Sequence, residues 1–252
     1  MSTESTQTCF SAIADNIQSL RASIADLSAQ SPYGQEVTLM AVTKTVDVDR
    51  INYAIDACGI RCIGENRVQE LCDKYPQLHL DGVSVHLIGS LQSNKVKYIA
   101  DKVDLIHSLD SISLAKEIDR QAKKHSRVID CLIEINIGRE EAKGGIAPEA
   151  DEILSFYDEV SAFEHVRITG LMTIAPNCAG LPDATERYMA YFSETRRLFE
   201  QLCEERLSVH PDIKPILSMG MSGSYEPAIL CGSDIVRVGS GIFGARPVRS
   251  MN

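Results

Sequence analysis

The chain has 252 residues, which is long enough for one α/β barrel or for two small domains. Apolar residues make up 44% of it and charged residues 24%, the balance of an ordinary globular protein. The net charge of −10 argues against nucleic acid as a partner, because nucleic-acid binding depends on a basic surface.

The N-terminal segment predicts one amphipathic helix. Its first residues lack the basic and apolar regions of a signal peptide, and no apolar run in the chain approaches the ~20 residues that cross a bilayer. We therefore expect a cytoplasmic protein without membrane contact. Apolar residues then recur with helical spacing until the turn at residues 31–34; they are Phe10, Ile13, Ile17, Leu20, Ile24 and Leu27.

Eight short apolar runs follow, and each is interpreted as a β-strand. The runs are continuously apolar, as expected when helices cover a parallel sheet. The predicted strands are Val37–Thr43, Arg61–Gly64, Val83–Ile88, Val103–His107, Val128–Ile137, Val166–Ile174, Ile213–Ser218 and Asp234–Val238. Helical patterns follow the first seven strands, at Val48–Cys58, Asn66–Tyr75, Ser93–Ala100, Ser111–Lys124, Pro148–Phe163, Pro182–Leu207 and Tyr225–Cys231. Pro148 and Pro182 fit the first turns of their helices, where a missing N–H costs nothing.

Strict alternation of eight strands with helices predicts a closed (β/α)8 barrel of the TIM type, in the α/β class. An open dinucleotide-binding sheet would usually carry GxGxxG in its first turn, where this chain has Thr43–Val46. No low-complexity linker divides the chain, so we expect a single domain over residues 1–252. Within it, the N-terminal helix and its linker take residues 1–34, the barrel takes 35–246 and a tail takes 247–252.

Two turns near the carboxyl ends of the last two strands are candidates for a phosphate site. Ligands of such barrels bind at that end, and phosphates often lie between the loops after strands seven and eight. One turn contains Gly220 and Ser222, and the other contains Gly239, Ser240 and Gly241. Small side chains, hydroxyl groups and accessible backbone N–H groups are what a phosphate needs. The same residues are equally consistent with a phosphate site and with two tight turns that bind no ligand.

Three lysines are candidates for an amine that reacts with an aldehyde. Lys44 ends the first strand, and a lysine held against low-dielectric walls near Arg237 could be neutral and nucleophilic. Lys95 and Lys143 follow other strands at the same end of the barrel. The residues alone do not choose among the three.

Other polar residues within the strands are open to two interpretations. Arg237 interrupts an apolar strand, so its side chain points either outward to an acidic helix or inward to an anion or an aromatic nitrogen. For His86 and His107, in strands three and four, we expect hydrogen-bonded barrel residues and not metal ligands. The eight cysteines include no CxxC pair, which indicates neither a zinc site nor a dithiol motif and favours reduced core residues.

Six segments, in order from the first strand to the last, resemble the pyridoxal 5′-phosphate (PLP) homeostasis protein family. They are AVTK (41–44), GENRVQE (64–70), HLIGSLQSNK (86–95), GLMTI (170–174), LSMGMS (217–222) and VRVGSGIFGAR (236–246). The resemblance covers nearly the whole chain. It implies a barrel related to the N-terminal domain of alanine racemases, with PLP held as a Schiff base (an aldimine) on Lys44.

The resemblance also implies roles for other residues. Ser222 and the Gly239–Ser240 turn would hold the phosphate, and Arg237 would face the pyridine nitrogen. Asn66 would lie beside the cofactor, with Met172 or Ile174 against its ring. Family members are described as regulators of vitamin B6, without an established reaction.

Three functions of different classes follow as hypotheses. The first is a monomeric PLP carrier or regulator with PLP-dependent apo-enzymes as acceptors. The second is a PLP-dependent amino-acid racemase with weak activity. Racemases of this fold add a β-rich second domain, for which the residues after the last strand leave no room, and an Arg beside the pyridine nitrogen would weaken PLP as an electron sink. Both points favour the carrier. The third is a Schiff-base aldolase that uses Lys44 without PLP.

Overall fold

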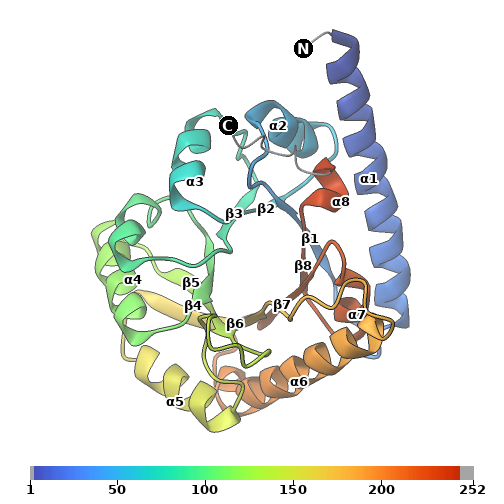
Figure 1. Ribbon diagram of the computed structural model, residues 1–252. Coiled ribbons are helices and arrows are strands. Elements are labelled where there is room, and N and C mark those ends of the chain that lie inside the picture. The colour runs from blue at the N-terminus through green and yellow to red at the C-terminus, as the bar shows by residue number, and fades with distance from the viewer. Residues whose placement is uncertain (1–2, 245–252) are drawn as a thin grey trace.

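The computed structural model describes residues 3–244, which contain a closed barrel of eight parallel strands (Figure 1). The strands follow one another around the barrel in chain order, and β8 pairs with β1 to close it. They are β1 (Thr38–Val42), β2 (Cys62–Glu65), β3 (Ser84–Leu87), β4 (Leu105–Leu109), β5 (Ile129–Ile135), β6 (Val166–Thr173), β7 (Ile216–Met221) and β8 (Ile235–Val238). The predicted TIM-type barrel is therefore confirmed.

Helices form the outer ring. They are α1 (Thr3–Gln30), α2 (Val48–Asp56), α3 (Val68–Lys74), α4 (Ile112–Lys124), α5 (Ala150–Val160), α6 (Ala184–Glu205), α7 (Tyr225–Leu230) and α8 (Ser240–Phe243), with the 3-10 helices η1 (Tyr75–Gln77), η2 (Ser93–Tyr98) and η3 (Leu207–Val209). Side-chain caps begin two of them: Asp47 Oδ1 accepts from the Arg50 N–H at 3.0 Å, and Ser111 Oγ accepts from the Leu114 N–H at 3.4 Å. Within residues 3–244, no helix is both long and apolar enough to cross a membrane.

Two details of the helices differ from prediction. The caps of α5 and α6 are Glu149 and Asp183, so Pro148 and Pro182 each precede the cap and do not enter the first turn. The fixed φ of proline suits both the residue before a helix cap and the first turn of the helix. The sequence therefore does not distinguish these two positions for Pro148 and Pro182. The segment after β3 forms a 3-10 helix, the geometry usual for such short connections.

Two boundaries near the barrel mouth also differ. The third helix begins at Val68, which leaves Asn66 in the turn after β2. Strand β7 continues past Ser218 to Met221 because Gly220, with φ +89°, sits in an irregularity of the β7–β8 pairing. A Cβ on Gly220 would lie 2.6 Å from the Cβ of Ala228 on α7, so this position has no room for a larger residue. The sequence predicted a turn at Gly220, and the structure has a β-bulge there. The predicted end of the barrel at 246 and the tail 247–252 lie outside the described residues.

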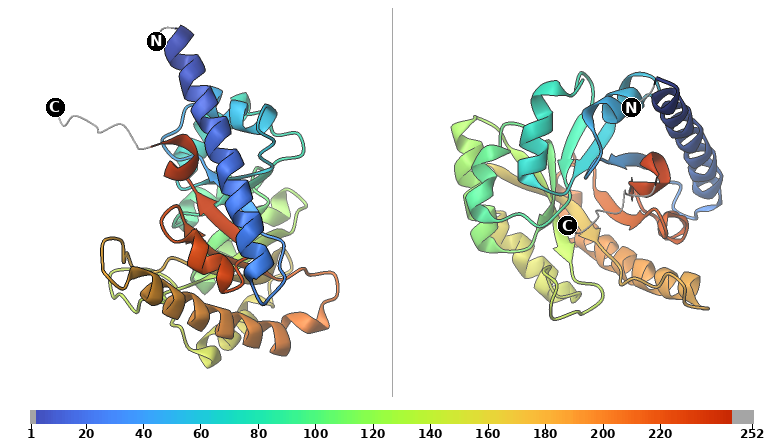
Figure 2. Two further views of the ribbon diagram at one scale, coloured as in Figure 1. Left: turned by 90° about the vertical axis from the view of Figure 1, so that its right-hand side faces the viewer. Right: turned by 45° about the horizontal axis from the view of Figure 1, so that its top comes forward.

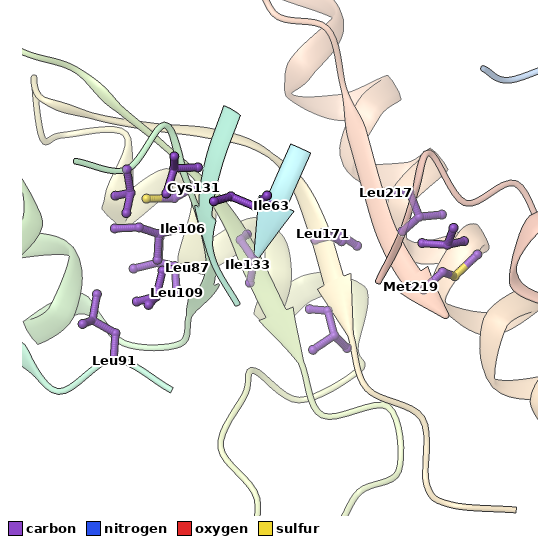
Figure 3. Close-up of a cluster of buried hydrophobic side chains, with 14 of the residues drawn as sticks. Ile63, Leu87, Leu91, Ile106, Leu109, Cys131, Ile133, Leu171, Leu217 and Met219 are labelled. Carbon is purple, nitrogen blue, oxygen red and sulfur yellow. The ribbon is translucent and has the colours of Figure 1, made fainter. Parts of the chain in front are cut away.

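Apolar side chains form two layers. The outer one fills the space between strands and helices; Figure 3 shows part of it, with Ile63, Leu87, Ile106, Ile133, Leu171 and Leu217 labelled. The inner layer lies within the barrel and consists of Met40, Val42, Cys62, Ile88, Leu105, Leu132, Met172 and Ile235. Because strand side chains alternate, β1, β2, β4, β5, β6 and β8 each contribute to both layers, and the barrel is a packed core.

The first helix lies along the outside of the barrel beside α7 and α8 (Figures 1 and 2). Its apolar stripe is buried there, including Ile13 and Ile17. Asn16 Nδ2 donates to the Ile242 carbonyl at 3.0 Å, and the hydroxyls of Ser23 and Tyr225 lie 3.1 Å apart. Helix α1 therefore supports the two short helices that follow β7 and β8.

Candidate functional site

A cavity of about 250 Å³ lies at the carboxyl ends of the strands. Seven of the eight residues proposed from the sequence line it: Lys44, Asn66, Ile174, Ser222, Arg237, Gly239 and Ser240. The remaining lining residues are Val42, Ile88, Met221 and Gly223. Two other cavities, of about 300 and 550 Å³, lie toward the amino ends of strands and contain none of the eight. The cavity at the carboxyl ends is therefore the candidate site.

Lys44 reaches the cavity from a tight turn directly after β1. The Val46 N–H donates to the Thr43 carbonyl at 3.1 Å, which closes the turn. The two competing lysines do not line the cavity. Lys143 pairs with the Glu140 carboxylate at 2.6 Å, and the Lys95 ammonium lies 5.7 Å from the centre of the Tyr98 ring. Lys44 is thus the lysine that the fold brings to the site.

The turns after β7 and β8 meet on one side of the cavity. The hydroxyl of Ser222 accepts from the backbone N–H groups of Gly239 and Gly241, each at 3.3 Å. Close packing leaves little room for a larger residue at Gly241, since a Cβ there would lie 2.8 Å from the Val238 Cγ1. The two backbone N–H groups therefore converge on the Ser222 oxygen, and the hydroxyl hydrogen of Ser222 is left to donate elsewhere.

Asn66 presents a buried polar atom without a protein partner. Its backbone N–H donates to Glu65 Oε1 at 2.7 Å, but its side-chain Oδ1 is buried with no hydrogen bond among the described residues. A buried polar atom left unpaired costs free energy, which a ligand with a donor group would recover. Gly89 allows this placement, because a Cβ there would lie only 2.2 Å from the Asn66 carbonyl oxygen.

The apolar candidates differ in position. Ile174 lines the cavity with 36% of its surface exposed, whereas Met172 is fully buried in the inner layer and does not line it. Met221, 39% exposed, also lines the cavity and was not among the residues proposed from the sequence. Met221 could have been predicted from its position in the LSMGMS segment, directly before Ser222.

Arg237 points into the barrel. Only 4% of it is exposed, and its guanidinium donates to Ser218 Oγ and to the Thr173 carbonyl, both at 2.7 Å. Burial lowers its pKa to about 10, an effect that the carboxylate of Glu134 opposes. Of the two orientations open from the sequence, the structure has the inward one, and Arg237 is among the residues that line the cavity.

Glu134 on β5 is a polar residue that the sequence reasoning missed. Burial and the nearby carboxylate of Asp110 raise its pKa to about 7, and the positive charge of Arg237 works against them. Its inward orientation could have been inferred from the alternation of strand side chains, because Glu134 lies two residues after Leu132, which faces the barrel interior. A carboxyl group with a pKa near neutrality therefore accompanies the buried guanidinium.

A chain of hydrogen bonds crosses the barrel below Arg237. It contains, in order, Arg237, Ser218, His107, His86, Ser84 and Asp104, with successive distances of 2.7, 3.1, 2.9, 2.7 and 3.5 Å. Burial lowers the pKa of His86 to about 4 and that of His107 well below its usual value, so both rings are neutral. The expectation that both are hydrogen-bonded barrel residues is confirmed.

Donor counting gives this chain a direction. A guanidinium only donates, so Ser218 accepts from it and turns its own hydrogen to His107 Nδ1. His107 then donates from Nε2 to His86 Nδ1. The far end is the carboxylate of Asp104, which only accepts. A hydrogen-bonded chain with one consistent direction therefore connects Arg237, through Ser218, to the two histidines in the barrel interior.

Comparison with known proteins gives three findings. The family described as "Alanine racemase, N-terminal domain" matches residues 10–247. A "Pyridoxal phosphate homeostasis protein" of Aquifex aeolicus is 42% identical over 208 residues, which are 82% of this chain and 86% of the relative. The structure of PipY from Synechococcus elongatus with PLP bound is 33% identical, with a TM-score of 0.75, and the match covers 92% of this chain and all of PipY.

A more distant likeness concerns the fold alone. The alanine racemase of Clostridium difficile is 15% identical, with a TM-score of 0.64, over 94% of this chain and 59% of the racemase. The barrel is thus shared with a racemase, while the similarity of sequence lies with the homeostasis proteins. This chain belongs to the pyridoxal phosphate homeostasis protein family.

Proposed function

We propose that this protein binds PLP as a Schiff base on Lys44 and acts in intracellular vitamin B6 homeostasis as a carrier or regulator. Its family and the PLP-bound structure of PipY support the choice of cofactor. Relatives from three bacteria are named homeostasis proteins and not enzymes, which supports the carrier over a racemase. The observation that carries the proposal is the single cavity that gathers Lys44, the two small-residue turns and Arg237.

The residues of the cavity fit PLP group by group. The hydroxyls of Ser222 and Ser240 and the backbone of Gly239 would hold the phosphate, at the place where the turns after β7 and β8 meet. Ile174 offers an apolar contact to the ring, with Met172 in the layer beneath it. Asn66 Oδ1 offers an acceptor that lacks a partner, and Arg237 would face the ring nitrogen.

Lys44 would supply the covalent link. Its neutral amine attacks the aldehyde carbon of PLP, a C=N bond replaces the C=O bond, and the oxygen leaves as water. The reverse reaction with water releases PLP and restores the amine. A link that forms and breaks without another reactant suits storage and delivery, with apo-enzymes as the proposed acceptors and a cytoplasmic monomer as the proposed form.

Arg237 supports a carrier more than an enzyme. When bound, PLP acts as an electron sink, most strongly when its ring nitrogen is protonated. A guanidinium that faces this nitrogen disfavours its proton. Among the described residues lining the cavity, no carboxylate, imidazole or phenol stands opposite Lys44 to act as a second acid or base. A racemase with weak activity therefore remains the second candidate, supported by the shared barrel alone.

The proposal is tested by the spectrum of the purified protein. Added PLP should give the visible absorption of a Schiff base, and borohydride followed by peptide mapping should place the label on Lys44. The variants Lys95→Ala and Lys143→Ala are matched controls that should keep the absorption, whereas Lys44→Ala should lose it. A label on Lys95 or Lys143 would show that the wrong lysine was chosen, and an aldolase without PLP would show no such absorption at all.

A further inference from the structure

A buried cluster of three charged side chains lies beside the turn that carries Lys44. The ammonium of Lys74 on α3 lies 3.2 Å from Glu65 Oε2 and 2.6 Å from Glu70 Oε1. Their side chains are 12%, 1% and 21% exposed, respectively. Burying charges costs free energy unless geometry and further hydrogen bonds compensate, so such a cluster is a poor device for stability alone.

The further hydrogen bonds of the cluster go to the Lys44 turn. Thr43 Oγ1 donates to Glu65 Oε2 at 3.0 Å, and Lys74 Nζ donates to the Thr43 carbonyl at 2.8 Å. On the other side of Lys44, the Thr45 N–H donates to Glu70 Oε1 at 2.5 Å. Each charged residue of the cluster therefore holds a residue that flanks Lys44.

The turn needs such support. Thr45 occupies its third position with φ +62°, a left-handed conformation that turns of this kind usually give to glycine. For a β-branched residue this conformation is strained and persists only where the surroundings impose it. The hydrogen bond from the Thr45 N–H to Glu70 is the contact that imposes it at the strained residue itself.

The cluster also reaches the neighbouring part of the cavity wall, at the end of β2, the strand that pairs with β1. The second oxygen of Glu65 accepts from the Asn66 N–H at 2.7 Å, and Asn66 lines the cavity with its unpartnered Oδ1. One carboxylate thus fixes a neighbour of Lys44 and the backbone of Asn66 together. None of Glu65, Glu70 and Lys74 lines the cavity itself.

We propose that Glu65, Glu70 and Lys74 are positioning residues that hold the strained turn so that the Lys44 amine faces the aldehyde of bound PLP. This inference rests on the proposed function. It assigns the cluster a role in covalent capture of PLP, separate from the Ser222 and Gly239–Ser240 turns that would hold the phosphate. Loss of the cluster should therefore slow capture and leave phosphate-directed binding intact.

The test uses Glu70→Ala, which removes the acceptor of the Thr45 N–H, and Glu70→Gln, which keeps an oxygen there. Gln69→Ala is the matched control, because it deletes an exposed side chain of the same helix, whose hydrogen bond within residues 3–244 is to Asp73. Thr43→Val, of nearly the same shape, removes the contact with Glu65 and carries the test should Glu70→Ala fail to fold. Two quantities are measured on each variant: the rate of Schiff-base absorption after mixing with PLP, and the affinity for pyridoxine 5′-phosphate, whose alcohol cannot react.

Glu70→Ala and Thr43→Val should slow capture by at least about tenfold, the change that follows from losing a hydrogen bond to a charged group in the reacting conformation. Their affinity for pyridoxine 5′-phosphate should stay within about twofold of wild type, and Gln69→Ala should match wild type in both quantities. Capture by Glu70→Gln should exceed that by Glu70→Ala. Wild-type capture rates in both Glu70→Ala and Thr43→Val, or an equal loss of capture and of pyridoxine 5′-phosphate affinity, would overturn the inference. Absence of capture by the wild-type protein would instead overturn the proposed function.

Discussion

Ser240 is a small, neutral residue at the cavity, one position after Gly239 and close to the Ser222 hydroxyl on which two backbone donors converge. The net charge of the whole chain is −10, so the protein as a whole does not attract an anion. In the proposed site, binding of a phosphate would therefore depend on local donors at these few residues. Single-residue changes at this point should accordingly affect ligand affinity far more than stability.

Replacing Ser240 with Asp should weaken PLP binding by at least tenfold. The change removes a hydroxyl donor, and loss of a charge-assisted contact costs about 1.5–3 kcal/mol, to which repulsion between carboxylate and phosphate adds. Titration of the purified variant with PLP measures the effect.

Ser126→Asp is the matched control for this substitution. It makes the same change of charge at an exposed residue between α4 and β5, at the amino end of the barrel. Its backbone is left-handed, with φ 52°, a conformation that Asp tolerates. Equal affinities for wild type and Ser240→Asp would remove the turn after β8 from the phosphate site.

At the scale of the elements, strand alternation determined most of what could be predicted. The eight apolar runs and the helices between them follow from periodicity, and the carboxyl ends of the strands then locate the site. The turns after β7 and β8 were found in this way. Lys44 was found only as one of three candidate lysines, and the family resemblance chose among them. The orientation of Arg237 was not, because it depends on which face of β8 points inward; Ile235, two residues earlier, occupies the inner layer.

Contacts between elements that are distant in the chain could not be predicted from the sequence. In the sequence, Glu65, Glu70 and Lys74 look like ordinary charged residues of a strand end and a helix. Their contacts with the turn after β1 are seen only in the structure. His86 and His107 likewise meet because β3 and β4 are neighbours in the barrel. Irregular pairing adds to the difficulty, since shifts of register in β4–β5, β5–β6 and β7–β8 interrupt the simple alternation of faces.

The histidines on β3 and β4 should make stability depend on pH. Because the folded pKa of His86 is lowered from 6.5 to about 4, the unfolded chain binds more protons between these values. His86 therefore contributes stability that is fully present above pH 6.5 and is lost as the pH falls toward 4, by about 3 kcal/mol in total. His107 acts in the same direction.

The measurement must separate His86 from groups whose protonation changes stability in the opposite direction. The pKa of Glu134 is raised to about 7, so its protonation stabilises the fold as the pH falls through the same range. Urea unfolding of wild type and of His86→Asn at several pH values isolates the histidine. Wild type should lose stability relative to the variant between pH 6.5 and 4. A difference that does not change with pH would mean that folding leaves the pKa of His86 unshifted.

For the molecule as a whole, the question is whether a shared barrel implies a shared reaction. Alanine racemase has the barrel at 15% identity, which establishes architecture alone. Removing and returning a proton on opposite faces of an α-carbon needs two groups within hydrogen-bond reach. Lys44 offers one of them, and Arg237, with a pKa of about 10, holds its proton at neutral pH.

The PLP-loaded protein should accordingly show little racemisation. Incubation with L-alanine in deuterated water, followed by mass spectrometry and chiral chromatography, should give slow α-deuteration and almost no D-alanine. An authentic alanine racemase under the same conditions is the positive control. Turnover in the usual enzyme range of about 1–1000 per second would contradict the carrier proposal.

Helix α1 supports α7 and α8, the two short helices that follow the turns proposed to hold the phosphate. A ligand that orders these turns also orders the surface on which α1 lies, so ligand binding and α1 docking are thermodynamically linked. Linkage is reciprocal: the factor by which docked α1 tightens the ligand equals the factor by which the ligand tightens α1. In the proposed PLP carrier, an outside molecule that binds α1 would therefore change PLP retention without entering the barrel mouth.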